Sequence, residues 1–517
     1  MGEVQKAAGS GAPKAARSGG VGRQAFLLEP QFNRAVKVRT TDERITSDAG
    51  LLLLREADHR LGLTEHLASR LVDPRRPDRI RYELAELLRE RLYALALGYA
   101  TEDDADRLAH DPAMKLAAWN RPGQQPLDER LASQPTQSRL VNILTLPANQ
   151  DALRDSLAEC CARHLRAGGG DHAARHVTLD VDSFPIPVHG HQPGAAYNGF
   201  YRETVYHPIV ASYSVAGHYD SFQEGHRLGN GFVHAVLRAG QVHTADGVLP
   251  FLEETLRLAE PLGYRLDLRL DAGFVEGEVL DWLTERNVRF LGRIKANAAL
   301  DRLAAPHLVR PVGRPPKEGY ETIVELEPYQ AESWKYPQRL VLVVVDRPDP
   351  VTGQLNLLPN YFFLIVGWAK DELGAEEALA HYRQRGTFED RLGEFRQATD
   401  VHLSHPEFDE NQTELRLALL AFNLANALRI EYERDGGSCM DLVRFQRDVL
   451  KAGARITRHA RRLIVCVARV VRPFWESLAG CLRRWKLPSS FPPPLGPHRR
   501  CWMPPPRHAF LTEVRRL

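Results

Sequence analysis

The stretch VTLDVDSF, residues 177–184, decides the fold class of this 517-residue chain. Apolar and polar residues alternate in it, which is the pattern of a β-strand with one buried face. Two further β-prone runs follow at 208–215 and 232–240, and turn-rich segments separate the three runs. The sequence therefore predicts a sheet whose first three strands are consecutive in the chain.

Helices and strands alternate after these three runs. An amphipathic helix is predicted at 245–262 and a second helix at 276–287, and a β-prone run follows each of them, at 264–271 and 289–294. The resulting order, β-β-β-α-β-α-β, is the core of the ribonuclease-H-like fold, in which helical crossovers add parallel strands to an antiparallel set. We therefore predict an α/β protein with a ribonuclease-H-like core.

The remaining segments surround this core. Three β-prone runs within about 296–370 predict a β-rich insertion ahead of a further helix. Apolar residues recur at helical spacing before the core, which predicts a helical domain at 31–165. A leader rich in Gly and Ala, at 1–30, is expected to be disordered, and the α/β domain covers 170–430. A basic C-terminal region with a Pro-rich tail is predicted at 431–517.

Charge and hydropathy narrow the class of protein. The chain has 68 Lys and Arg against 66 Asp and Glu, so its net charge of +2 does not by itself indicate a nucleic-acid partner. Residues 451–517, however, carry 15 Lys and Arg against two acids, which suits phosphate binding, with a solvated basic tail as the alternative. No apolar run approaches about 18 residues and residues 1–20 lack a signal-peptide core, so we expect a cytoplasmic protein without a membrane span.

Carboxylates in two predicted strands are candidates for a functional site. Asp180 and Asp182 lie two residues apart in the first strand, so their side chains share one face. Asp271 ends the strand at 264–271, just ahead of a Gly turn, where α/β sheets commonly bind ligands. Capping of the following helix is the alternative role of Asp271. Acids on an apolar strand are costly to bury alone, so a cation or a basic partner is expected beside them.

A third acid lies in the stretch HYRQRGTFEDRLGEFR, at 381–396, which is predicted to form one continuous helix. An aromatic residue, two cations and an acid would share one face of it: Tyr382, Arg385, Glu389 and Arg396. Such a stripe is unlike a core face, and a surface row of ion pairs is the alternative. Gly386 costs about 1 kcal/mol in a helix interior, which we interpret as room for a close approach.

The three acids Asp182, Asp271 and Glu389 suit hard, oxygen-seeking cations such as Mg²⁺ or Mn²⁺. The six cysteines show no CxxC spacing, so neither a zinc site nor a disulfide scaffold is expected. Two such cations activate a water or a 3′-hydroxyl and stabilise the leaving oxygen of a phosphodiester. The chemistry indicated is therefore the cutting and transfer of DNA or RNA strands.

These residues resemble the DDE transposases of bacterial insertion sequences, in the branch with a β-strand insertion before the catalytic Glu. The last helix of that branch carries Tyr, two residues, Arg, three residues, Glu, six residues and Lys. The segment 382–396 matches this signature, with Arg396 in the Lys position. Other blocks that look like the family are ITSDAGLLLLR at 45–55, HGHQ at 189–192, YNGFY at 197–201 and LDAGF at 270–274.

The resemblance implies specific roles for the site residues. Asp182, Asp271 and Glu389 would be the catalytic, metal-binding acids, with Asp180 as the alternative first acid. Two Mg²⁺ or Mn²⁺ ions would be the cofactors. Three further side chains would contact DNA: Tyr382, Arg385 and Arg396. His189, His191 and the cluster at 197–201 follow the first acid. Ordinary packing is the favoured role for each singly, and lining of the DNA channel is the alternative.

The resemblance also implies partners and a reaction. The helical domain would bind DNA, and a homodimer would bridge the two inverted repeats of a transposon, cleave them and join them to target DNA. A metal-dependent nuclease of the same fold, which cuts without rejoining, is the first alternative. A non-catalytic DNA-binding descendant is the second, and the presence of all three acids argues against it.

Overall fold

The structure, a computed structural model, describes most of the chain between residues 26 and 485. The described ranges are 26–120, 125–169, 176–215, 229–263, 265–310, 319–348, 354–355 and 358–485. Most of the predicted disordered leader, the Pro-rich tail and Cys501 therefore lie outside the described residues. The chain divides into two units, residues 1–44 and 45–517. In the first unit, Leu28 and Val38 form an isolated antiparallel bridge.

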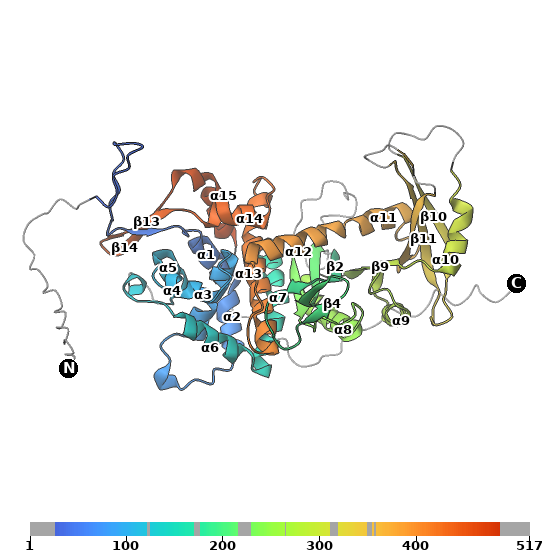
Figure 1. The fold of residues 1–517 in the computed structure, drawn as a ribbon, viewed down its shortest axis with the longest axis horizontal. Helices are drawn as coiled ribbons and strands as arrows, with labels where there is room; N and C mark the ends of the chain where they lie inside the picture. Colours follow the sequence, from blue (N-terminus) through green and yellow to red (C-terminus); the bar gives the residue numbers. More distant parts are fainter. Residues whose placement is uncertain are drawn as a thin grey trace, which may run out of the picture. The chain divides into compact units, whose positions relative to one another are not determined.

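Helices fill the first part of the second unit (Figure 1). They are α1 (Leu51–Leu61), α2 (Leu63–Arg70), α3 (Leu84–Ala96), α4 (Asp104–Leu108), α5 (Pro112–Ala118), α6 (Gln134–Leu144) and α7 (Pro147–Ala167). A capping box starts α3, in which the Glu83 N–H donates to the Glu86 carboxylate at 3.0 Å. Every side chain of α3 is buried, because α3 packs against α2, α5, α6 and α13 (Phe408–Arg434).

An eight-stranded mixed sheet forms the α/β part of the second unit, in the order β10-β11-β12-β9-β8-β2-β6-β7. Its strands are β2 (His176–Ser183), β6 (Ile209–Val215), β7 (Gly229–Val236), β8 (Arg265–Leu270), β9 (Arg289–Ile294), β10 (Tyr320–Tyr329), β11 (Gln338–Asp346) and β12 (Asn360–Val366). The predicted α/β class is therefore confirmed.

The strands of the predicted core pair in a mixed pattern. β2 is antiparallel to β6 and parallel to β8, and β8 is parallel to β9. The helices α8 (Val248–Ala259) and α9 (Gly277–Glu285) make the two crossovers that parallel pairing requires. Along the chain, the elements of this sheet up to β9 follow the predicted β-β-β-α-β-α-β order.

The strands predicted as an insertion do not form a sheet of their own. β12 pairs antiparallel with β9, from Phe363 opposite Ile294 to Val366 opposite Leu291, and β11 and β10 follow outward. The segment at about 296–370 thus prolongs the sheet that contains β2 and β8. Its described residues between β9 and β10 include the helix α10 (Ala298–Ala304).

The two faces of the sheet serve different purposes. Three alternate residues of β2 pack in the apolar cluster that contains residues of α8 and α9: Val177, Leu179 and Val181. Because strand side chains alternate, Asp180 and Asp182 point to the opposite face. The same alternation on β8, whose Leu268 and Leu270 belong to that cluster, sends Arg269 to the side of the two acids. The charged side chains of both strands therefore meet on one face.

Helices from the last third of the chain bring further residues to the sheet. α11 (Ala375–Arg383) and α12 (Gly386–Thr399) lie end to end, with α11 beside β9 and β10 and α12 beside α13 (Figure 1). α13 is the apolar helix predicted at 415–430, and every side chain from Glu410 to Glu431 is buried. It backs α12 and β7 in the core.

A basic segment follows α13. It contains α14 (Leu442–Phe445), β13 (Ala454–His459), β14 (Arg462–Val467) and α15 (Arg472–Arg484), and β13 and β14 pair in a small sheet of order β1-β13-β14 with β1 (Arg44–Thr46). Residues 451–485 carry nine Lys and Arg against one acid. Among the described helices, none combines the length and the apolarity needed to cross a membrane.

A buried carboxyl in α3 makes the stability of the helical region depend on pH. Glu90 is 2% exposed, and the Ala132 N–H donates to its carboxylate at 3.2 Å. Burial raises the pKa of Glu90 from 4.5 to about 8, and the Ala132 hydrogen bond only partly opposes this. The folded protein therefore keeps a proton that the unfolded chain releases above its lower pKa. Stability attributable to this group falls as the pH rises from about 4.5 to about 8.

We expect Glu90→Gln to remove this pH dependence. The neutral amide carries no charge to bury, so the variant should match the parent near pH 4.5 and exceed it in stability at pH 9. The gain should reach a few kcal/mol, at about 1.4 kcal/mol for each unit of pKa shift. Thermal unfolding between pH 5 and pH 9 measures the difference, with exposed Glu376→Gln as the control. A difference that is constant across this range would contradict the explanation.

Candidate active site

The first acid of the site comes from the end of β2. Asp182 is 17% exposed, and its carboxylate forms an ion pair with Arg385. Its second contact is local, because the Ser183 N–H donates to it at 2.8 Å. In the antiparallel pairing of β2 with β6, Asp182 lies opposite Val210. The strand pairing thus holds this carboxylate at the edge of the sheet.

The second acid follows β8 directly. Asp271 was predicted as the last strand residue, and the structure places it one residue after the strand end at Leu270, with its side chain 40% exposed. The alternative role as a helix cap is wrong, since α9 begins at Gly277 with Glu276 in the cap position. The turn after Asp271 is close-packed, because a Cβ on Gly273 would lie 2.9 Å from Thr244. Gly is therefore the residue that fits this turn.

The third acid lies on the exposed side of α12. Glu389 is 63% exposed, whereas the opposite side of the helix is buried through Phe388 and Phe395, which both pack near Phe232 of β7. Arg391 ties α12 to the sheet, because its guanidinium donates to the Ser212 hydroxyl on β6 at 2.7 Å. The helix is therefore anchored firmly while Glu389 faces outward.

One guanidinium gathers the three acids. Arg385 donates to Glu389 at 2.7 Å, lies 3.7 Å from the nearest Asp271 oxygen, and forms the ion pair with Asp182. Only 10% of its side chain is exposed. Residues 182, 271 and 389, which are far apart in the chain, thus meet around a single cation. The structure brings together the three acids that the sequence selected.

Negative charge outweighs positive charge in this cluster. Burial, opposed by Arg385 and by the Ser183 hydrogen bond and assisted by the charges of Asp271 and Glu389, raises the pKa of Asp182 to about 6. Three carboxylates against one guanidinium leave an excess that a divalent cation would neutralise. The acids are also oxygen ligands from three rigid elements. Their chemistry therefore fits Mg²⁺ or Mn²⁺.

Asp180, the alternative first acid, has a different partner. Its carboxylate accepts two hydrogen bonds from Arg269, at 2.8 Å and 2.7 Å, and both side chains are 1% exposed. The third donor of Arg269 reaches the His381 carbonyl oxygen at 2.8 Å. Asp180 thus takes part in a buried ion pair that joins β2, β8 and α11. Arg269 was not among the predicted residues, although the charged and apolar alternation of its strand was visible in the sequence.

The helix that carries the predicted stripe is not continuous. α11 ends at Arg383 and α12 begins at Gly386, so the prediction of one helix over 381–396 is wrong. At the junction, the Arg385 N–H bonds the Tyr382 carbonyl at 2.9 Å, a tighter turn than in an α-helix. A Cβ on Gly386 would meet no described atom within 4 Å, so the close approach inferred for this Gly is absent from the described chain.

The remaining members of the stripe lie at different depths. Tyr382 is half-buried, and burial together with the charges of Asp271 and Glu389 raises the pKa of its phenol to about 12, despite the opposing Arg385. Arg396 is exposed on α12, seven residues beyond Glu389 and hence on the same side of that helix. Tyr382 therefore borders the acids, and Arg396 lies about two turns farther along.

An aromatic turn lies near the acids. It joins β4 (Ala196–Asn198) to β5 (Glu203–Tyr206), which form a small sheet with β3 (Ile186–Pro187). Phe200 is 87% exposed at its tip, and Tyr201 contacts both Phe200 and His207 edge to face. Burial and the charges of Asp182 and Asp271 raise the pKa of Tyr201. His189 and His191 lie between β3 and β4 and are exposed.

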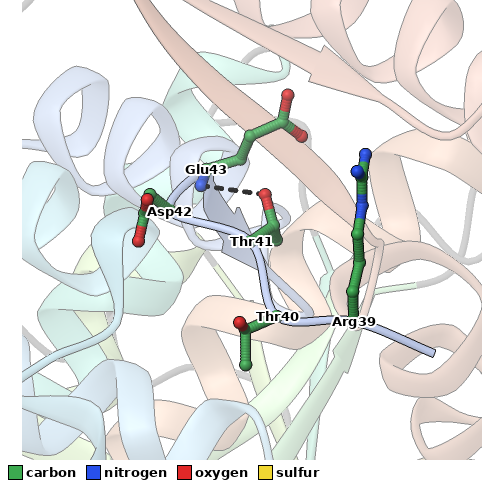
Figure 2. A pocket seen from close by; sticks show the side chains of 5 residues that line it. All are labelled: Arg39, Thr40, Thr41, Asp42 and Glu43. Atoms are coloured by element: carbon green, nitrogen blue, oxygen red, sulfur yellow. Dashed lines mark hydrogen bonds between the residues drawn. The ribbon is translucent and has the colours of Figure 1, made fainter. Parts of the chain in front are cut away.

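A separate surface pocket takes no part in this site. Figure 2 shows that consecutive residues of the first unit, Arg39 to Glu43, line it. Its one hydrogen bond between the drawn residues joins the Glu43 N–H to the Thr41 hydroxyl at 3.2 Å. None of the three gathered acids lines this pocket.

Comparison with known proteins places the chain in context. Residues 28–485 match the family described as "Transposase DDE domain group 1". Among solved structures, the chain is similar to a piggyBac transposase in a cryo-EM structure of its synaptic complex with hairpin DNA. The identity is 11%, over 84% of this chain and 81% of that one, with a TM-score of 0.37. No curated protein matches the chain.

Proposed function

The chain belongs to the DDE transposase domain family, and from this premise we propose that it cleaves and joins DNA at the ends of a bacterial insertion sequence. One observation carries the proposal: acids from β2, from the end of β8 and from α12 converge on Arg385. The β-β-β-α-β-α-β order supports a ribonuclease-H-like core as their scaffold. Asp182, Asp271 and Glu389 are the proposed catalytic residues.

Mg²⁺ or Mn²⁺ is the proposed cofactor, held by these three carboxylates. Two such ions, when bound, supply a nucleophilic hydroxide or 3′-alkoxide and stabilise the leaving oxygen. Asp182 and Asp271 are fixed by the parallel pairing of β2 with β8, which presets their separation before any ligand arrives. Glu389 is more exposed than either, so its carboxylate can adjust from the surface of α12.

Arg385 has a proposed double role. Without DNA, its guanidinium balances part of the negative charge of the three acids, as the ion pairs indicate. A guanidinium also binds phosphate through paired donors, so the scissile phosphate is its proposed partner once cations replace it beside the acids. Tyr382, which borders the acids, and Arg396, farther along α12, are proposed to contact the DNA backbone on either side of Arg385.

Other parts of the chain are proposed to hold DNA outside the site. The basic segment at 451–485 has the charge to bind phosphates, and the helical region at 31–165 is its proposed companion. Exposed Phe200 and the adjacent Tyr201 present rings on which an unpaired base would stack. Binding of two inverted repeats requires two such sites, so a homodimer on DNA is the proposed assembly.

The test is an in vitro reaction on linear DNA that carries the inverted repeats flanking the gene, with a supercoiled plasmid as target. With Mg²⁺ or Mn²⁺, we expect release of the ends and their covalent joining to the plasmid, scored by sequencing of the junctions. Cleavage without joining would favour the nuclease alternative. Specific binding without cleavage under any divalent ion would favour the non-catalytic descendant.

We expect Arg385→Ala to bind Mn²⁺ more tightly in the absence of DNA, although it cleaves DNA poorly. Removal of the guanidinium leaves three carboxylates without a cation, and charge-assisted hydrogen bonds of this kind are worth about 1.5–3 kcal/mol, or about 10–100-fold in affinity. Titration calorimetry with Mn²⁺ measures the change.

Arg383→Ala is the matched control for this prediction. Arg383 lies two residues earlier and pairs with Glu321 on β10 instead of with the three acids. Its removal should leave Mn²⁺ affinity unchanged. Equal affinities in the parent and in Arg385→Ala would show that the guanidinium does not compete with the cation.

A further inference from the structure

A second group of possible metal ligands lies away from the three catalytic candidates. It consists of Glu102, just before α4, His405, in the loop between α12 and α13, and Glu414 on α13. One ligand atom from each lies within 4.8 Å of the other two. The His405 Nε2 is 4.0 Å from the Glu102 Oε1 and 3.8 Å from the Glu414 Oε2.

Each carboxylate of this group has one oxygen occupied and one oxygen open. The Glu102 Oε2 accepts from Ser138, and the Glu414 Oε1 accepts from Arg91. The Glu102 Oε1 and the Glu414 Oε2 face His405 and accept no hydrogen bond within 3.5 Å from the described residues, and the imidazole that they face lies at 4.0 Å and 3.8 Å. Glu414 is 1% exposed, so its open oxygen is not satisfied by bulk water. A carboxylate oxygen buried this deeply needs positive charge beside it, which either a protonated His405 or a bound metal ion can supply.

The protein holds the imidazole in place through the backbone of its loop. The Asn411 amide oxygen accepts from the His405 N–H at 3.1 Å, and the Asn411 amide nitrogen donates to the His405 carbonyl oxygen at 2.9 Å. Asn411 itself is fully buried at the start of α13. These two hydrogen bonds fix the backbone of the loop at His405 against the start of α13.

We propose that Glu102, His405 and Glu414 bind a divalent transition metal, Zn²⁺ in the first place. One imidazole nitrogen and two carboxylate oxygens are a set that Zn²⁺ accepts, at bond lengths of about 2.0–2.2 Å. Ligands at those lengths are about 3.4 Å apart in a tetrahedral site. The two His405 distances, 4.0 Å and 3.8 Å, would each close by roughly half an ångström, and the two carboxylate oxygens, which lie within 4.8 Å of each other, by at most about 1.4 Å. Water would complete the coordination.

The metal would cross-link three segments that are distant in the sequence. Glu102 belongs to the helical region, Glu414 to the helix at the centre of the core, and His405 to the loop that follows α12. Because α12 also carries Glu389, the cross-link would fix the far end of the helix on which the third catalytic candidate lies. The inference concerns a structural metal and does not depend on the proposed DNA chemistry.

The test uses the full chain with Asp271→Asn, a change that weakens binding at the three gathered acids. Metals are first removed by a chelator. After Zn²⁺ is added back and unbound Zn²⁺ is removed, we expect one Zn²⁺ per chain by elemental analysis and a Tm higher than that of the metal-free chain. Co²⁺ should give the visible absorption of a site with a nitrogen ligand. His405→Gln should weaken the affinity for Zn²⁺ by about 100-fold or more and abolish the rise in Tm.

His402→Gln is the matched control, because His402 lies in the same loop but is 56% exposed and faces Asp400. It should keep the full affinity and the full rise in Tm. If His405→Gln does not fold, Glu102→Gln tests the same site from the opposite side and should weaken Zn²⁺ binding likewise. The proposal would be overturned if the chain retained no Zn²⁺, or if Glu102→Gln retained as much Zn²⁺ as the parent. Neither result bears on the DNA-joining reaction, which has its own assay.

Discussion

Glu389→Gln is expected to eliminate DNA cleavage and joining while the fold stays intact. The amide keeps the shape of the side chain and can still accept from Arg385, but it loses the negative charge that a divalent cation needs. If the carboxylate contributes about 4 kcal/mol to stabilisation of the transition state, the rate falls by about 10³-fold or more. The rate of end cleavage in Mg²⁺ measures the loss. Because Glu389 is 63% exposed, the Tm should change little.

The neighbouring acid supplies the control for Glu389→Gln. Asp390 is also exposed on α12, but it forms no ion pair with Arg385 within the described residues. Asp390→Asn should therefore retain most of the cleavage rate. Cleavage by Glu389→Gln at the parental rate would remove Glu389 from the proposed catalytic set, and it would leave the two aspartates of the strands without their partner on the helix.

Local patterns in the sequence predicted the sheet well. Alternation in 177–184 and at 264–271 identifies β2 and β8 because each strand buries one face against α8 and α9 while its other face carries charge. That alternation also predicted that Asp180 and Asp182 share a face, and the strand at 264–271 placed Asp271 at its end. Such patterns depend only on neighbours in the chain, so a single sequence contains them.

These local patterns could not predict contacts between residues that are distant in the chain. Nothing near Asp180 indicates that Arg269 takes its charge, because that pairing follows from the register of β2 with β8. The attachment of β12 to β9 is likewise a pairing across the sheet. Sequence rules for metal sites look for ligands at short, regular spacings. They therefore miss Glu102, His405 and Glu414, which lie far apart in the sequence and close together in the fold.

The break between α11 and α12 has a subtler cause. Both residues at the junction keep nearly helical backbone angles, with φ −66° and ψ −9° at Gln384 and φ −58° and ψ −31° at Arg385. No Pro marks the position, and helical periodicity therefore continued through it. The change lies in the hydrogen bonds, which tighten to a spacing of three residues around Arg385. This tight turn is where the guanidinium leaves the backbone toward the three acids.

The assignment of the first acid rests on a contrast between Asp180 and Asp182 that stability can test. Arg269→Met should lower the free energy of unfolding by about 3–5 kcal/mol, because it leaves the Asp180 carboxylate buried without its cation. The double change Asp180→Val with Arg269→Met should recover most of this loss, since an apolar pair needs no counter-charge. Urea unfolding followed by Trp fluorescence measures both. Asp182→Asn, two residues along the same strand, should cost little stability yet abolish DNA cleavage. The reverse pattern, with activity lost in Asp180→Asn at unchanged stability and kept in Asp182→Asn, would make Asp180 the first catalytic acid.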